Sequence, residues 1–119
     1  MKILVTLLFM VFASLAVADV SIVATIDAPD TLITGLGYGN GSLWAVNSGD
    51  EIAYQLDPGT GSVLNSWTLT QPGAKKVSGC TFANSTLYVC AGNLPNLTAS
   101  YCYKYTTSGT YSGSFSLDC

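Results

Sequence analysis

The sequence predicts an all-β protein built from two four-stranded antiparallel units. Two observations lead to this fold class. Short segments rich in Val, Leu, Tyr and Trp alternate with turns rich in Gly, Asn, Ser and Asp, and no segment after residue 18 has the apolar periodicity of a helix. The second half of the mature chain also repeats the first, which indicates a duplicated structural unit.

Residues 1–18 precede these units and have the features of a secretory signal peptide. Lys2 supplies the positive charge, residues 3–12 form the apolar stretch, and Ala16-Val17-Ala18 is a small-x-small cleavage site. The apolar stretch is shorter than the roughly 20 residues needed to span a membrane. We therefore expect a secreted or periplasmic mature chain, residues 19–119, with no membrane span.

The mature chain is expected to open with an extra strand at residues 20–28. This segment and Pro29, which follows it, resemble residues 66–72 at the end of the first repeat unit. The first unit spans residues 33–69 and the second spans residues 77–117.

The repeat is clearest where residues 35–46 align with residues 79–90, at an offset of 44. Both stretches read as strand, turn and strand, with Asn40-Gly41 as a strong hairpin signal and Asn84-Ser85 as a weaker version. The offset later rises to 49 because of extra loop residues before the third strand of the second unit. Eight strands are expected, at residues 33–38, 42–47, 51–56 and 62–69, and at residues 77–83, 86–91, 100–106 and 110–117.

The second strand of each unit is apolar on both faces, as residues 43–46 and 87–90 show. A sheet with one wet face would alternate apolar and polar residues, so this pattern favours sheets stacked on sheets. Four-stranded antiparallel units that recur about every 40–45 residues and stack face to face describe the blades of a β-propeller.

Residues 35–48, 52–58 and 61–64 also resemble a blade of the secreted β-propellers, the families related to NHL-repeat, streptogramin-lyase-like and quinoprotein-like propellers. The resemblance implies four-stranded antiparallel propeller blades over nearly all of the mature chain. It implies no single function, since such propellers serve as enzymes, lectins and scaffolds.

Two blades and one extra strand do not divide into whole blades, and two blades cannot close a ring. Three interpretations follow. The first is an incomplete propeller whose C-terminal blades are missing. The second is a homo-oligomer in which identical chains close a ring, as in certain small fucose-binding lectins. The third is a small sandwich or barrel.

The composition argues against nucleic-acid binding and against catalysis. Charged residues make up 9% of the chain, and its mature part has three Lys and no Arg, although phosphate binding needs clustered Lys and Arg. The chain has no His, the commonest general base and the usual partner of a Ser or Cys nucleophile. No catalytic residue, cofactor or metal is predicted, and Asn47, Ser48 and Asp50 are expected to form a turn rather than a calcium site.

The four cysteines all lie in the last third of the chain, and an even number in an exported protein suggests disulfides. If residues 84–86 form the hairpin turn of the second unit, Cys80 lies opposite Cys90. These two residues are then either a disulfide or a buried apolar pair. Cys102 and Cys119 are left without an assigned partner.

Trp44, Trp67 and Tyr88 are candidates for a carbohydrate-binding platform. However, Tyr88 and Phe115 occupy in the second unit the positions of the two tryptophans, and aromatic residues that recur in this way favour packing between sheets. Three more tyrosines share one face of a strand and are expected in the core: Tyr101, Tyr103 and Tyr105.

The sequence thus predicts a secreted, non-enzymatic binding or scaffold module that belongs to a larger propeller and has a protein or a glycan as its partner. Two alternatives stay open. One is an oligomeric carbohydrate-binding lectin that closes a ring from two-blade subunits, and the other is a truncated fragment of a propeller enzyme.

Overall fold

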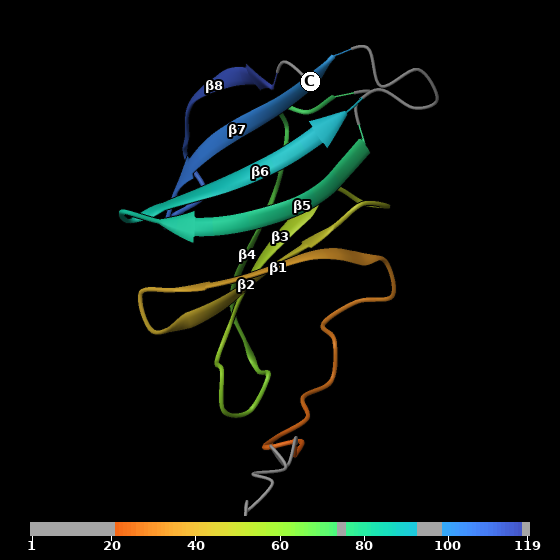
Figure 1. Cartoon of the computed structure of the whole chain (residues 1–119), viewed down its shortest axis with the longest axis vertical. Coiled ribbons are helices and arrows are strands. Elements are labelled where there is room, and N and C mark those ends of the chain that lie inside the picture. Colours follow the sequence, from red (N-terminus) through yellow and green to blue (C-terminus); the bar gives the residue numbers. More distant parts are fainter. Residues whose placement is uncertain (1–20, 74–75, 93–98, 118–119) are drawn as a thin grey trace, which may run out of the picture.

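The computed structural model describes residues 21–73, 76–92 and 99–117. These residues form two four-stranded antiparallel sheets, with the strand orders β1-β2-β3-β4 and β5-β6-β7-β8 (Figure 1). No helix occurs in the described ranges, so the all-β class and the division into two four-stranded units are confirmed. Accordingly, no helix in this part of the chain is long and apolar enough to cross a membrane.

Each strand begins and ends within one residue of its predicted bounds, because turn residues mark both ends. The first sheet contains β1 (Ile33–Gly39), β2 (Ser42–Asn47), β3 (Ile52–Leu56) and β4 (Val63–Thr68). The second contains β5 (Lys76–Ala83), β6 (Thr86–Gly92), β7 (Ser100–Thr106) and β8 (Tyr111–Leu117).

The first hairpin of each sheet has a two-residue turn. Asn40 and Gly41 have φ angles of 52° and 71°, and Asn84 and Ser85 have φ angles of 49° and 59°. Positive φ at both central residues defines a type I′ turn, whose twist matches that of the flanking strands.

The two sheets share their irregularities as well as their strands. The β1–β2 ladder shifts register between Ile33 and Gly35, and the β5–β6 ladder shifts between Val77 and Gly79. The β3–β4 and β7–β8 ladders also shift at equivalent places, at Gln55/Leu56 and at Lys104/Tyr105. The duplication therefore extends to the β-bulges.

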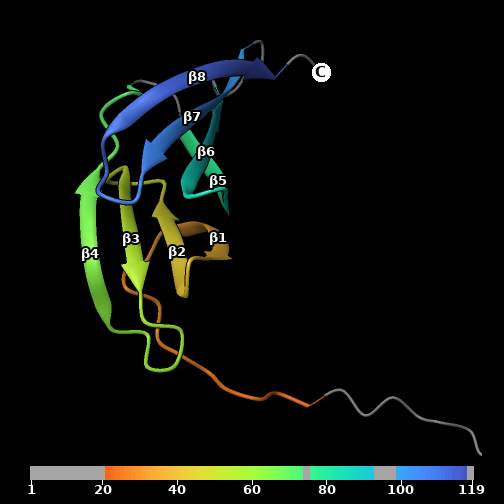
Figure 2. The same cartoon turned by 90° about the vertical axis from the view of Figure 1, so that its left-hand side faces the viewer.

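The predicted extra strand is not formed over residues 21–28, which belong to neither sheet; Val20 lies outside the described residues. In a propeller this strand would complete a blade begun by three other strands, and the residues that the structure describes contain no three-stranded sheet with an edge left for it. The segment instead leaves the first sheet as an extended chain (Figure 2).

The hydrophobic core lies between the two sheets. β1 and β5 lie side by side on the inner, concave side of the two sheets, whereas β4 and β8 lie on the outer side (Figure 2). The core combines first-sheet and second-sheet residues: Trp44, Val46, Ala53, Leu69, Val77, Leu87, Val89, Ala91, Tyr103 and Tyr105. The prediction that the tyrosines of β7 belong to the core is confirmed for Tyr103 and Tyr105, against which Tyr101 is partly buried.

Candidate functional site

The contact between the sheets is centred on Trp44. Its side chain is fully buried, and its ring stacks on Phe82 with the centroids 4.8 Å apart and an angle of 5° between the planes. Its indole N–H donates a hydrogen bond to the carbonyl oxygen of Gly39 at 2.9 Å. Trp44 therefore packs the sheets together and is excluded from any exposed ligand platform.

The other two platform candidates lie elsewhere. Trp67 is half-buried, with its ring 6.0 Å from that of Trp44, and its buried indole N–H has no hydrogen-bond partner among the described residues. Tyr88 lies on β6, where Leu87 and Val89 face the core, so its side chain points to the opposite face of the second sheet. The three aromatic residues do not form one surface.

The two sheets use different faces of the repeat unit to contact each other. The first sheet contributes Trp44 and Val46, whereas the second contributes Leu87 and Val89. An offset of 44 places Trp44 on Tyr88, which lies on the far face of the second sheet. The sheets therefore stack face to back, each in the same orientation, and not with like faces together.

Two equivalent glycines show the same asymmetry. A Cβ atom on Gly35 would lie 2.5 Å from the backbone nitrogen of Cys80 and 2.6 Å from the Cα of Gly79, because β1 and β5 approach closely there. A Cβ atom on Gly79, the equivalent residue in the second sheet, would have nothing within 4 Å. In the first sheet this position is packed against the neighbouring sheet. In the second sheet the equivalent position, Gly79, faces open space.

This open face of the second sheet is called the Tyr88 face, and it carries residues that alternate with those of the core. It includes apolar and uncharged groups, of which Phe115 is 45% exposed, and one cation, Lys104, which is paired with Tyr88. Cross-strand pairing brings its members together: Gly79 with Cys90, Thr81 with Tyr88, and Cys102 with Phe115.

The outer face of the first sheet is called the Tyr38 face. Tyr38 and Leu36 are 64% and 61% exposed, and both lie on β1. Next to them, residues 26–29 run over Ala45 and Leu56 and leave an apolar groove of about 180 Å³. By the repeat, these residues correspond to the segment with the buried Leu69 and Pro72, which connects the two sheets.

A hydrogen bond fastens the chain beside this groove. The Tyr54 hydroxyl donates to Oδ2 of Asp30 at 2.9 Å, and the backbone N–H of Thr31 donates to Oδ1 at 2.6 Å. The Thr31 N–H and then the Tyr54 hydroxyl hold the pKa of Asp30 below its usual value. Burial and the nearby carboxylate raise the pKa of Tyr54.

The predicted pairing of Cys80 with Cys90 is wrong in this structure. The turn contains two residues rather than three, so Ala83 pairs with Thr86, and Cys80 lies opposite Val89. Cys80 and Cys90 consequently lie on opposite faces of the sheet, and both are free thiols. The Cys80 thiol donates to the carbonyl oxygen of Trp44 at 3.4 Å.

Cys90 lies instead directly opposite Cys102, with their sulfur atoms 3.4 Å apart. The sequence did not reveal this pair, because the loop before β7 left the β6–β7 register undetermined. The repeat contained the signal, since Cys90 and Cys102 align with Val46 and Ala53, which are paired in the first sheet. Cys119 lies outside the described residues.

The loop with Asn47, Ser48 and Asp50 forms a turn, as the sequence predicted. Oδ1 of Asn47 accepts hydrogen bonds from the backbone N–H groups of Gly49 and Asp50 at 2.6 and 2.9 Å. Within residues 21–73, 76–92 and 99–117, no group of three His, Cys, Asp or Glu side chains is arranged to hold a metal ion.

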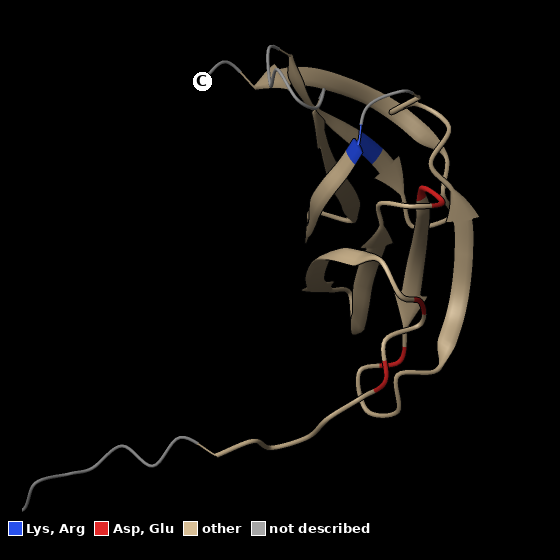
Figure 3. Cartoon of the chain, turned by 90° about the vertical axis from the view of Figure 1, so that its right-hand side faces the viewer, with Lys and Arg blue, Asp and Glu red and all other residues tan. Residues whose placement is uncertain are grey.

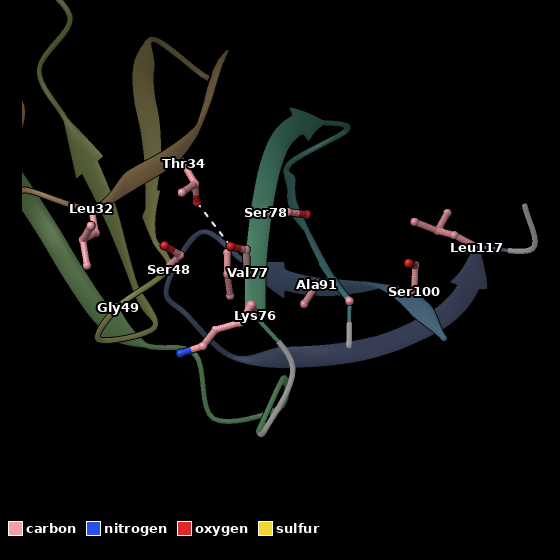
Figure 4. A pocket seen from close by; sticks show the side chains of 11 residues that line it. Leu32, Thr34, Ser48, Gly49, Lys76, Val77, Ser78, Ala91, Ser100 and Leu117 are labelled. Carbon is pink, nitrogen blue, oxygen red and sulfur yellow. Dashed lines mark hydrogen bonds between the residues drawn. The ribbon is translucent and has the colours of Figure 1, made fainter. Parts of the chain in front are cut away.

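A larger groove of about 790 Å³ lies between one end of the first sheet and the second sheet (Figure 4). The Thr34 hydroxyl donates across it to the carbonyl oxygen of Val77 at 3.3 Å. Its lining includes Leu32, Leu117, several hydroxyl groups and the ammonium of Lys76, but no carboxylate. The described lining residues contain no acid–base pair.

Comparisons with known proteins add no family. No protein-family model matches the sequence, and no curated protein is significantly similar to it.

Proposed function

We propose that this chain is a secreted, non-enzymatic binding or scaffold module whose sheets are propeller-like blades, and that it works by stacking with further blades. The observation that carries the proposal is the face-to-back contact, which leaves a different face without a partner sheet at each end: the Tyr88 face, and the part of the Tyr38 face around Leu36 and Tyr38. A second observation supports stacking with a further sheet: the space next to Gly79 is empty, whereas the space next to the equivalent Gly35 is filled by β5.

The occupant of the open face that we propose is a second copy of this chain. The Tyr38 face of one copy would cover the Tyr88 face of another, as the second sheet covers the first within one chain. An offset of 44 places Tyr38 on Phe82 and Trp44 on Tyr88. Tyr88 of one copy would therefore stack on Tyr38 of the next, in the way that Trp44 stacks on Phe82.

Such a contact is heterologous, because each copy contributes a different face. It leads to a ring if the rotation between copies closes, and to an open stack if it does not. Charged residues are sparse on both sheets (Figure 3), so little like-charge repulsion opposes the contact between two copies.

The test is the molar mass of the purified mature chain over a range of concentrations, measured by sedimentation velocity or by light scattering after size exclusion. We expect concentration-dependent association. Thr81→Lys adds a second cation to the Tyr88 face, which already carries Lys104, and Tyr38→Lys places a charge on the Tyr38 face, so each variant alone should remain monomeric. Thr110→Lys, in the exposed β7–β8 turn, is the matched control and should associate normally.

Mixing the two face variants makes the test specific. Each variant keeps one intact face, so an equimolar mixture should form a heterodimer and nothing larger. A symmetric contact between two Tyr88 faces would instead be lost in Thr81→Lys and unaffected in Tyr38→Lys. A wild-type chain that stays monomeric at every concentration would overturn the proposal.

A further inference from the structure

Two thiols face each other across adjacent strands of the second sheet. Cys90 on β6 and Cys102 on β7 are direct partners in a ladder that runs without a bulge from Thr86 to Gly92. Their sulfur atoms, 3.4 Å apart, are already in contact. An S–S bond of about 2.0 Å needs Cβ atoms about 3.5–4.5 Å apart, and directly opposite residues of adjacent strands have theirs about 4.5–5.5 Å apart. Closing the bond therefore needs a small rotation of both side chains and a small approach of the two strands.

The repeat supports this register independently. Val46 and Ala53 occupy the same repeat positions in the first sheet and are paired there in the same way. The repeat unit therefore places Cys90 opposite Cys102. The second unit has two cysteines where the first has two apolar residues.

We propose that Cys90 and Cys102 are a redox pair that forms a cross-strand disulfide when the protein meets a disulfide-bearing oxidant, and that Cys80 stays a free thiol. Cys80 has no access to the pair, because its side chain lies on the other face of the sheet and contacts Trp44.

The reaction is a thiol–disulfide exchange in two steps. The Cys90 thiolate attacks one sulfur of the oxidant, RSSR, and forms a mixed disulfide while releasing RS⁻. Cys102 then loses its proton and attacks the Cys90 sulfur, which releases the second RS⁻. The two protons from the cysteines end on the two RS⁻ ions, so the pair is oxidised by two electrons and RSSR is reduced to two RSH.

Accessibility sets the order of these steps. Cys90 is half-buried and open to an oxidant, whereas Cys102 is only 4% exposed. Burial, and next the contact with Cys90, raise the pKa of Cys102 to about 12, so its thiolate is scarce at neutral pH. Cys90 is thus the entry point, and Cys102 reacts once the mixed disulfide lies beside it.

The experiment treats the folded mature chain with oxidised glutathione, blocks the remaining thiols and digests it with chymotrypsin under non-reducing conditions. Chymotrypsin cleaves after Phe, Tyr and Leu, so it separates all the cysteines into different peptides. We expect the Cys90 peptide joined to the Cys102 peptide, in the wild type and in Cys80→Ala alike. A bridge from Cys90 to Cys80, a bridge from Cys102 to Cys119, or free thiols throughout would overturn the proposal.

Thermal unfolding gives a second readout. Reduction should lower the melting temperature by about 10 °C in the wild type and in Cys80→Ala, because the closed loop constrains the unfolded chain. Cys90→Val and Cys102→Ala restore the residues of the first repeat, so both should fold, and their melting temperatures should not respond to reduction. A similar response in these two variants would contradict the assignment.

Discussion

The two hairpin turns have the same length and differ only in their second residue, Gly41 in one and Ser85 in the other. Comparing them shows what a left-handed backbone costs a residue with a side chain. Asn40-Gly41 uses glycine at the second turn position, whereas Asn84-Ser85 places a side chain there at a φ of 59°. A non-glycine residue in this region costs about 1 kcal/mol or slightly more. The second hairpin thus keeps its turn type because cross-strand packing outweighs that cost.

Ser85→Gly should therefore raise the free energy of unfolding by about 1 kcal/mol. The reciprocal variant Gly41→Ser should lower it by a similar amount, and steric contact cannot be the reason, because a Cβ atom on Gly41 has nothing within 4 Å. Urea unfolding followed by far-ultraviolet circular dichroism measures both changes. Equal stabilities for all three proteins would show that the turn backbone is not strained.

The sequence predicted turn positions better than register. Gly, Asn and Asp mark where strands end, but a turn of three residues and a turn of two fit the same string around Asn84. That single residue decides which face each side chain occupies. The predicted Cys80–Cys90 pair failed for this reason, and the Cys90–Cys102 pair was missed across a loop whose length fixes no register.

At the scale of elements, the β3–β4 connection depends on one carboxylate. Oδ1 of Asp57 accepts hydrogen bonds from the backbone N–H groups of Gly59 and Thr60, both at 2.8 Å. The Thr60 N–H, followed by that of Gly59, lowers the pKa of Asp57 below its usual value. The ionised group therefore stabilises the turn.

This lowered pKa gives a pH dependence with a defined sign. The stabilisation is fully present above the unfolded-state pKa, near 4, and is lost as the pH falls through the lower folded-state value. Asp57→Asn keeps an acceptor oxygen but cannot titrate, so its melting temperature should fall less than that of the wild type between pH 5 and pH 2. Parallel profiles for the two proteins would contradict the role assigned to Asp57.

The eight strands could be predicted because turn residues mark both ends of each one. Whether residues 20–28 form a strand depends on a partner strand, which their own sequence does not reveal. The segment has strand-like alternation, but a strand needs a neighbour for its backbone groups. Sequence pattern describes the segment and not the presence of that neighbour. The same limit applies to the Tyr88 face, since alternation identifies two faces but not which one is covered.

For the whole molecule, the contact between the sheets depends on a missing side chain at Gly35. Gly35→Ala would force β1 away from β5, and overpacking of this kind costs about 1–3 kcal/mol. Gly79→Ala is the matched control and should be neutral or slightly stabilising, because its Cβ atom meets nothing and alanine restricts the unfolded chain. Chemical denaturation of both variants measures the difference, and equal losses would argue against the close approach.

The repeated β-bulges have a consequence for solubility. The outermost strands, β4 and β8, expose backbone N–H and C=O groups that would template the strand of another molecule, and many proteins prevent this with lysine. In this chain charged residues are few, but both outer ladders carry a bulge at the same repeat position. A bulge twists an edge out of line for further pairing. We therefore expect backbone irregularity, more than charge, to hinder edge-to-edge pairing at β4 and β8, and duplication of the unit duplicated this feature.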